Sequence, residues 1–195
     1  MVMIITYRDL INCLEKDINH TSEIPSFIKM PLEFVKGNRR AWSKFWFIVL
    51  LRHMEYCENN KKYLFSKIRY VLFKHIFQKY QIKTQLFIHP NTIDEGLNIE
   101  HPGFVWIDST SKIGKNCTIL PRVLLGKKNP KVSPPAIFIG NNCYIGTGST
   151  ILGPVKIGDN VIIAAGSVVI NDIPDNCMVA GNPAVVKKRN IKPYI

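Results

Sequence analysis

The chain has 195 residues, of which 46% are hydrophobic, and a formal net charge of +12. This apolar content is enough for a packed core and argues against disorder. The longest apolar run, residues 45–51, is far shorter than the roughly 20 residues that cross a bilayer. The N-terminus also lacks the basic start and cleavage site of a secretory signal. We therefore expect a cytoplasmic protein.

The net charge indicates the kind of partner, and the cysteine spacing limits the possible disulfides and metal sites. Residues 1–86 carry 15 basic and 7 acidic side chains, so +8 of the +12 lies in this half. Such an excess predicts an anionic partner or substrate. The five cysteines have no paired short spacing, which argues against both a disulfide framework and a zinc cluster.

Residues 7–82 have a helical pattern. Their apolar residues recur three and four apart, as in Leu64, Ile68 and Leu72. Two prolines in residues 22–34 predict a joint after the first helix, because proline breaks a helix interior. Residues 57–62, "CENNKK", separate two longer helices. The sequence thus predicts an α-helical N-terminal domain over residues 1–85.

A period of six replaces the helical spacing in the second half. The aliphatic positions of this period are Ile107, Ile113, Ile119, Leu125, Ile139, Ile145, Ile151, Ile157, Ile163 and Val169. Hexapeptide repeats of this kind fold as a parallel β-helix, in which each repeat forms one side of a triangular coil and points its aliphatic residue inward. We predict a β-helix over residues 86–185.

The same six-residue register explains the positions of two cysteines. Cys117 and Cys143 fall four residues after an aliphatic position, where other repeats have serine or valine. This position accepts small side chains, so we expect both thiols to be structural. Residues 127–136, rich in lysine and proline, interrupt the register and predict an extruded loop. Residues 186–195 are expected to form a basic tail.

The chain resembles the hexapeptide-repeat acyltransferases with a left-handed β-helix, in their serine acetyltransferase-like branch. The resemblance covers about residues 86–190 and is carried by "GLNIEHPGFVWID", "IGNNCYIGTGSTILGPVKIGDNVIIAAGSVV" and "DIPDNCMVAGNPAVVKK". It implies a homotrimer that binds acetyl-CoA between neighbouring β-helices and needs no metal. The helical part looks more like acetyltransferases of surface-polysaccharide loci.

The resemblance also implies the catalytic residue. The family's general base matches His101 in "EHPGFVWI", and a histidine that titrates near neutral pH suits the removal of a proton from an attacking hydroxyl. Glu100 is a candidate to orient the ring or bind the acceptor, and Gly126 is a candidate backbone donor to the oxyanion. His89, which also precedes a proline, is interpreted as structural.

The acetyl-CoA site is predicted farther along the repeats. Thr147 and Ala165 are eighteen residues apart, one full coil, so they should stack beside Gly146 and Gly166. In the family, backbone groups at these positions line the pantetheine arm. Lys187 and Lys188 are candidates for the CoA phosphates, with a solvated basic tail as the alternative.

Two departures from the serine-type enzymes favour another acceptor. Phe87 stands where those enzymes have an aspartate before "IHP", and the loop at 127–136 contains no histidine. Our first reading is therefore an O-acetyltransferase for a sugar hydroxyl of a surface polysaccharide or its precursor. Serine O-acetyltransferase is the alternative, and the terminal Ile195 keeps it open, because such enzymes commonly end in isoleucine.

A non-catalytic module is the competing class. Its basic, aromatic-rich helices would lie on a membrane surface or on nucleic acid. Core packing explains the aromatic spacing more simply, so we expect no nucleic-acid partner and keep peripheral membrane association as an option. A β-helix carbonic anhydrase needs three histidine ligands, whereas this half offers only His89 and His101.

Overall fold

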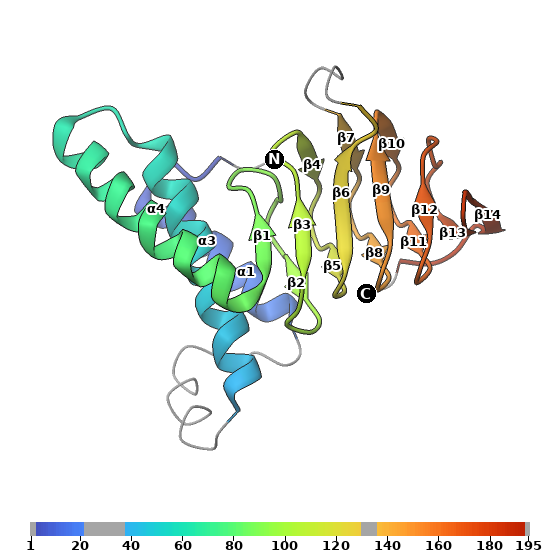
Figure 1. Cartoon of the computed structure of the whole chain (residues 1–195), viewed down its shortest axis with the longest axis horizontal. Helices are drawn as coiled ribbons and strands as arrows, with labels where there is room; N and C mark the ends of the chain where they lie inside the picture. The colour runs from blue at the N-terminus through green and yellow to red at the C-terminus, as the bar shows by residue number, and fades with distance from the viewer. Residues whose placement is uncertain (1–2, 22–37, 130–135, 194–195) are drawn as a thin grey trace.

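A computed structural model describes residues 3–21, 38–129 and 136–193 of the chain. The predicted proline joint at 22–34 and most of the loop at 127–136 lie outside these ranges. A helical region comes first, and three sheets of mainly parallel strands follow it (Figure 1). This is the left-handed parallel β-helix with a preceding helical part that the sequence predicted.

Three described helices form the N-terminal region: α1 (Tyr7–His20), α3 (Arg39–Asn59) and α4 (Leu64–Thr84). Helix α1 begins with a capping box, in which Thr6 accepts from the N–H of Asp9 and the Asp9 carboxylate accepts from the N–H of Thr6. Helices α3 and α4 are separated by residues 60–63, close to the predicted break. No helix among the described residues has the length and apolar content needed to cross a bilayer.

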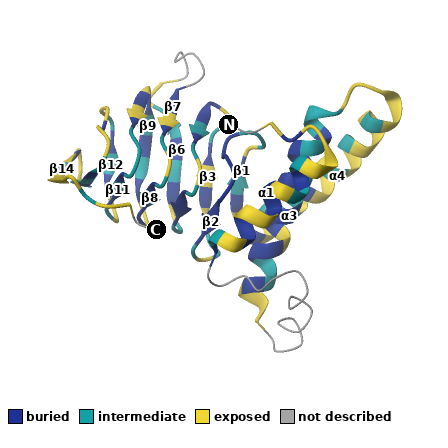
Figure 2. Cartoon of the chain, turned by 180° about the vertical axis from the view of Figure 1, so that it is seen from behind, coloured by how far each residue is buried: buried dark blue, intermediate teal, exposed yellow. Residues whose placement is uncertain are grey.

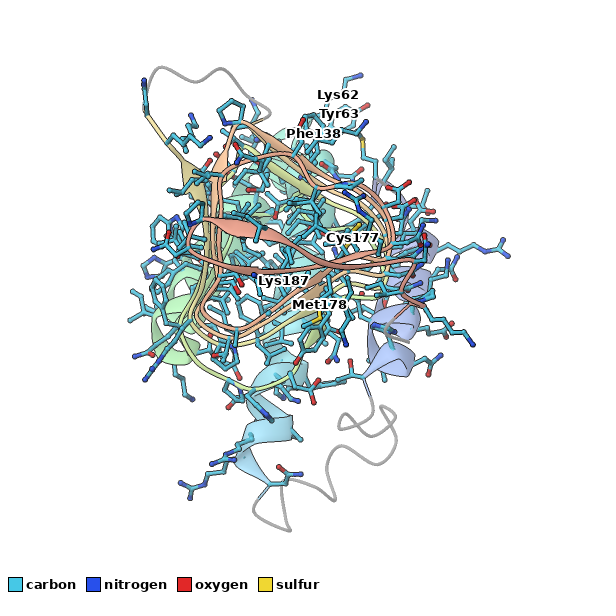
Figure 3. All side chains as sticks on the ribbon, turned by 90° about the vertical axis from the view of Figure 1, so that its right-hand side faces the viewer. Lys62, Tyr63, Phe138, Cys177, Met178 and Lys187 are labelled. Atoms are coloured by element: carbon cyan, nitrogen blue, oxygen red, sulfur yellow. The ribbon has the colours of Figure 1, made fainter. Side chains whose placement is uncertain are left out.

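The strands form three sheets, which are the three sides of the prism. Sheet A contains β1 (Leu86–Ile88), β3 (Val105–Ile107), β6 (Val123–Lys127), β9 (Thr150–Gly153) and β12 (Val168–Val169). Sheet B contains β4 (Ser111–Ile113), β7 (Ile137–Ile139) and β10 (Val155–Ile157). Sheet C contains β2 (Asn98–Ile99), β5 (Thr118–Ile119), β8 (Tyr144–Ile145), β11 (Ile162–Ile163), β13 (Cys177–Gly181) and β14 (Ala184–Arg189). Seen along its axis, the prism has a roughly triangular outline (Figure 3).

The strand register confirms the six-residue period. Ile145 pairs with Ile163, eighteen residues later, so three repeats complete one coil. All ten aliphatic positions predicted from the period are buried. Cys117 and Cys143 are also buried, in agreement with their predicted structural role. Hydrophobic burial inside the coils therefore fixes which residues turn outward at the corners.

Most corners of the prism require a left-handed backbone conformation, which most residues other than glycine disfavour. Three residues after the aliphatic position, φ is positive at Gly148 and Gly166, and also at the four asparagines Asn116, Asn142, Asn160 and Asn176. Glycine and asparagine tolerate this left-handed region best. The repeats therefore place these two residue types where the chain turns.

A buried ion cluster joins the helices to the first coil. The Arg52 guanidinium donates to the Asp17 carboxylate from Nε at 2.7 Å and to the Glu55 carboxylate at 2.9 Å. It also donates to the carbonyl oxygens of Ile93 and Asp94. Burial of Glu55 raises its pKa, which the neighbouring Arg52 charge opposes. The cluster ties α1 and α3 to the chain that leads into β2.

The C-terminal segment differs in part from the expected basic tail. Strand β14 pairs antiparallel with β13 and lies at the end of the prism far from the helices (Figure 1). The expected tail, residues 186–195, thus begins inside a paired strand. The hydrogen bonds of an edge strand explain why this charged segment is ordered.

Candidate active site

One edge of the prism gathers most of the predicted site residues. It consists of the corners where the chain passes from sheet C to sheet A, at residues 100–104, 120–122, 146–149 and 164–167. We call it the His101 edge. Its corners stack directly: the N–H of Gly148 donates to the carbonyl of Pro121 at 3.0 Å, and the N–H of Gly166 donates to the carbonyl of Thr147 at 2.8 Å. Since coils stack about 4.8 Å apart, His101 and Ala165 are separated by roughly 14 Å along this edge.

His101 turns outward because its corner is longer than the next one. Ile99 pairs with Ile119, and Val105 pairs with Val123, so the first corner contains two more residues than the second. The extra length lets the chain bulge, and His101 is exposed although the six-residue period would place an aliphatic residue there. Within the described residues its ring has no hydrogen-bond partner. The imidazole is therefore accessible to a substrate.

Glu100 does not orient His101 in this structure. Its carboxylate accepts a hydrogen bond from the Asn98 side-chain amide at 3.0 Å. No hydrogen bond or ion pair joins Glu100 to His101 within the described part of the chain. The physical reason is that consecutive residues of an extended chain project in opposite directions. The structure thus shows no direct contact between Glu100 and His101, and the other expected role of Glu100, binding the acceptor, stays a prediction.

The sequence did not reveal two buried polar residues beneath this corner. Lys44 of α3 is 1% exposed, and its ammonium donates to the Glu100 carbonyl at 3.0 Å. Asn98 is also buried, and its side-chain oxygen has no partner among the described residues. A buried lysine within a helix carries no sequence signal, because only the tertiary fold brings it to Glu100. Lys44 thus fixes the backbone that carries His101.

The residues predicted to line the pantetheine arm of acetyl-CoA lie on the same edge. Gly146 is packed so closely that an added Cβ would lie 2.6 Å from the Ala165 nitrogen, whereas a Cβ on Gly166 would meet nothing within 4 Å. Thr147 and Ala165 are exposed, and the Thr147 hydroxyl donates to the Pro121 carbonyl. The backbone N–H groups of Thr147 and Ala165 have no acceptor within the described residues. A narrow ligand arm can therefore approach this backbone closely.

Three other predicted residues lie away from the His101 edge. Gly126 is near the end of β6, where it pairs with Leu152 on sheet A, so a single chain does not bring it to His101. Lys187 and Lys188 belong to β14, the edge strand of sheet C. Lys187 lies at the end of the prism that faces the viewer in Figure 3. These lysines are exposed and can reach an anion at that end.

Arg122 is the main exposed residue that the sequence reading missed. It occupies the second corner of the His101 edge with a φ of 63°, and its N–H donates to the Phe104 carbonyl. The corresponding residues of the next two corners are Gly148 and Gly166. Arginine in this left-handed region costs conformational energy, and such strain is often found at functional sites. The six-residue register could have revealed it as the one long side chain at this corner position on the His101 edge.

Phe87, the residue before "IHP", forms an aromatic cluster. Its ring centroid is 5.5 Å from that of Trp106 and 6.2 Å from that of Phe104. Phe87 and Trp106 also line a cleft of about 480 Å³ between helices α3 and α4 and the start of sheet A, together with the side chain of His89. The His89 ring is thus exposed to this cleft, while its backbone is held by the first coil. Glu58 of α3 also lines this cleft.

The described residues contain no group of three or more His, Cys, Asp or Glu side chains that could hold a metal ion.

Comparison with known proteins gives a family model and named relatives. Residues 136–171 match the model described as bacterial transferase hexapeptide (six repeats). A serine acetyltransferase of Synechococcus elongatus is 36% identical over 111 residues, which cover 56% of this chain and 46% of that protein. The chain therefore spans about half the length of this curated relative.

Solved structures agree with the fold over nearly the whole chain. The serine acetyltransferase of Neisseria gonorrhoeae has a TM-score of 0.69 and 26% identity, and the match covers 95% of this chain and 67% of that one. A serine acetyltransferase solved as a complex with CoA has a TM-score of 0.62 and 25% identity, with 92% and 70% of the two chains covered. Both are similar to this chain in the helical part and in the β-helix. The likeness supports a serine acetyltransferase-like chain rather than one resembling polysaccharide enzymes.

Proposed function

We propose that the chain is an acetyl-CoA-dependent O-acetyltransferase that uses His101 as its general base. The observation that carries this proposal is the His101 edge. It presents an exposed imidazole in line with corners of small residues whose backbone N–H groups are open to a ligand. Similarity to serine acetyltransferases, one of them solved with CoA, supports it.

The chemistry follows from the position of the imidazole. Bound acetyl-CoA supplies an acetyl group activated as a thioester. His101 takes the proton of the acceptor hydroxyl while that oxygen attacks, and the protonated ring then returns the proton to the leaving sulfur. Thr147 and Ala165 bind the extended arm through backbone N–H groups. Arg122, one coil from His101, supplies a positive charge beside the reacting groups.

A homotrimer completes the proposed site. Gly126 lies on sheet A, away from the edge of its own chain that carries His101. In a trimer of β-helices, an edge of one chain faces a sheet of the next, so Gly126 of a neighbouring copy can approach the reacting carbonyl. This arrangement is the reason to keep Gly126 as a candidate oxyanion donor. A cytoplasmic location stays a prediction.

L-serine is the acceptor that the comparisons favour, since the relatives are named serine acetyltransferases. A sugar hydroxyl is a second candidate, supported by a different observation. Phe87 and Trp106 offer aromatic faces to the cleft next to the first coil, and no carboxylate stands at position 87 to serve a serine substrate. Aromatic rings of this kind commonly line sites for ring-shaped ligands.

Release of the CoA thiol tests both the role of His101 and the identity of the acceptor. The full chain is incubated with acetyl-CoA and either L-serine or a panel of sugars with free hydroxyls, beside the His101→Ala variant. We expect acceptor-dependent release that the variant loses, with L-serine ahead of every sugar. A sugar that outpaces serine would move the acceptor assignment to the second candidate. Equal release by the variant would remove His101 from the mechanism.

A further inference from the structure

Helix α4 exposes a large apolar surface. Among the described residues it and the preceding Tyr63 contribute half of the exposed large hydrophobic side chains: Tyr63, Leu64, Phe65, Ile68, Val71, Leu72, Ile76 and Ile82. Phe65 is 86% exposed and Leu64 is 71% exposed. Contiguous exposed apolar surface of this size marks an interaction site in a folded protein.

The apolar residues share one side of the helix. Phe65, Ile68, Leu72 and Ile76 follow each other three and four residues apart, and Leu64 and Val71 lie beside them. The opposite side, which includes the buried Phe77, packs toward α3 and β1. The exposed side of α4 runs along the outer border of the helical region (Figure 2). No described segment of this chain covers it.

The charge of α4 has a single sign. The helix contains Lys67, Arg69, Lys74, Lys79 and Lys83 and no acidic residue. Lys61 and Lys62 precede it, and Lys62 and Tyr63 lie at the periphery of the molecule in Figure 3. Lys67 and Lys74, seven residues apart, lie along one border of the apolar side. Lys79 and Lys83 lie on the apolar side itself, nearer the C-terminal end of the helix.

We infer that α4 docks on an anionic lipid surface. A lipid headgroup layer accepts both features at once, since cations contact the phosphates while apolar side chains enter the acyl boundary. A second copy of this chain fits less well, because two α4 helices placed face to face would bring two sets of five cations together without a counter-charge. The helix therefore holds the β-helix beside a membrane.

Flotation with lipid vesicles tests this inference on the full chain. Vesicles of phosphatidylcholine alone are compared with vesicles that contain about 30% phosphatidylserine, the type of anionic lipid that attracts basic segments. We expect recovery with the anionic vesicles only. The variant Phe65→Ser/Leu72→Ser should lose it, and Lys67→Glu/Lys79→Glu should weaken it by roughly tenfold or more. All four residues are exposed, so acetyl transfer to a soluble acceptor should not change.

The matched control is Lys156→Glu/Lys192→Glu, which alters the net charge equally on exposed residues outside α4. It should bind like the unaltered chain. Equal loss in the control would show that overall charge, and not α4, attracts the vesicles, and would overturn the inference. Two other results would do the same: no preference for anionic vesicles, or a smaller oligomer for Phe65→Ser/Leu72→Ser in light scattering, which would mean that a second copy covers α4.

Discussion

Replacement of Asp17 by asparagine should destabilise the fold strongly, because it removes one of the two carboxylates that neutralise the buried Arg52 guanidinium. Asp17 and Arg52 are 0% and 1% exposed. Oδ1 of Asp17 accepts from the backbone N–H groups of Gly96 and Leu97, while Oδ2 accepts from Arg52 Nε at 2.7 Å. Asparagine can keep the backbone bonds through its remaining oxygen. Its amide nitrogen, however, would then face the guanidinium as donor against donor.

Loss of one partner of a buried ion pair costs about 3–5 kcal/mol. For a chain of this size a change of 1 kcal/mol moves the melting temperature by roughly 2–4 °C. We therefore expect Asp17→Asn to melt roughly 6–20 °C lower, as followed by circular dichroism at a fixed protein concentration. Glu15→Gln, an exposed carboxylate of the same helix, is the control and should stay within about 0.5 kcal/mol. A loss for Asp17→Asn as small as that of the control would refute the assigned role of the cluster.

Three further predictions concern the His101 edge and the first coil. His101→Ala should lower turnover by roughly 100- to 10,000-fold, the usual loss for a general base. The affinity for acetyl-CoA and the melting temperature should be retained. A lower melting temperature with normal turnover would instead mark His101 as a structural turn residue. Arg122→Asn should raise the KM of a substrate while stability stays equal or rises by roughly 1 kcal/mol, since asparagine tolerates the left-handed φ; unchanged kinetics would exclude a role in substrate binding. Burial raises the pKa of Glu95, but hydrogen bonds from Lys16 and Lys115 outweigh this and lower its pKa below 4.5. A carboxylate whose pKa is lowered in the folded state stabilises the fold above its unfolded pKa, and this stability is lost as the pH falls through the folded pKa. Chemical denaturation from pH 6 to pH 3 should therefore show a smaller loss of unfolding free energy for Glu95→Gln than for the unaltered chain. Identical pH profiles would disprove this contribution.

The sequence alone determined the architecture of the second half. A six-residue period has one structural solution among common folds, since it buries an aliphatic side chain once per side of a triangular coil. The same arithmetic placed Gly146, Thr147, Ala165 and Gly166 correctly on stacked corners. The helical spacing likewise gave the three described helices, because burial of one helix face repeats every three to four residues.

Only the tertiary structure decided what surrounds His101. The contacts of Lys44 with Glu100 and of Asp17 with Gly96 join residues far apart in the chain, and no periodicity encodes such pairs. Glu100 illustrates the limit: its place in the sequence suggested a partner for His101, whereas its carboxylate bonds Asn98. The exposed side of α4 is a second example. Its apolar spacing predicts burial, whereas no described segment covers these side chains. A pattern states that a residue can be buried, but the packing of the whole chain decides which residues are.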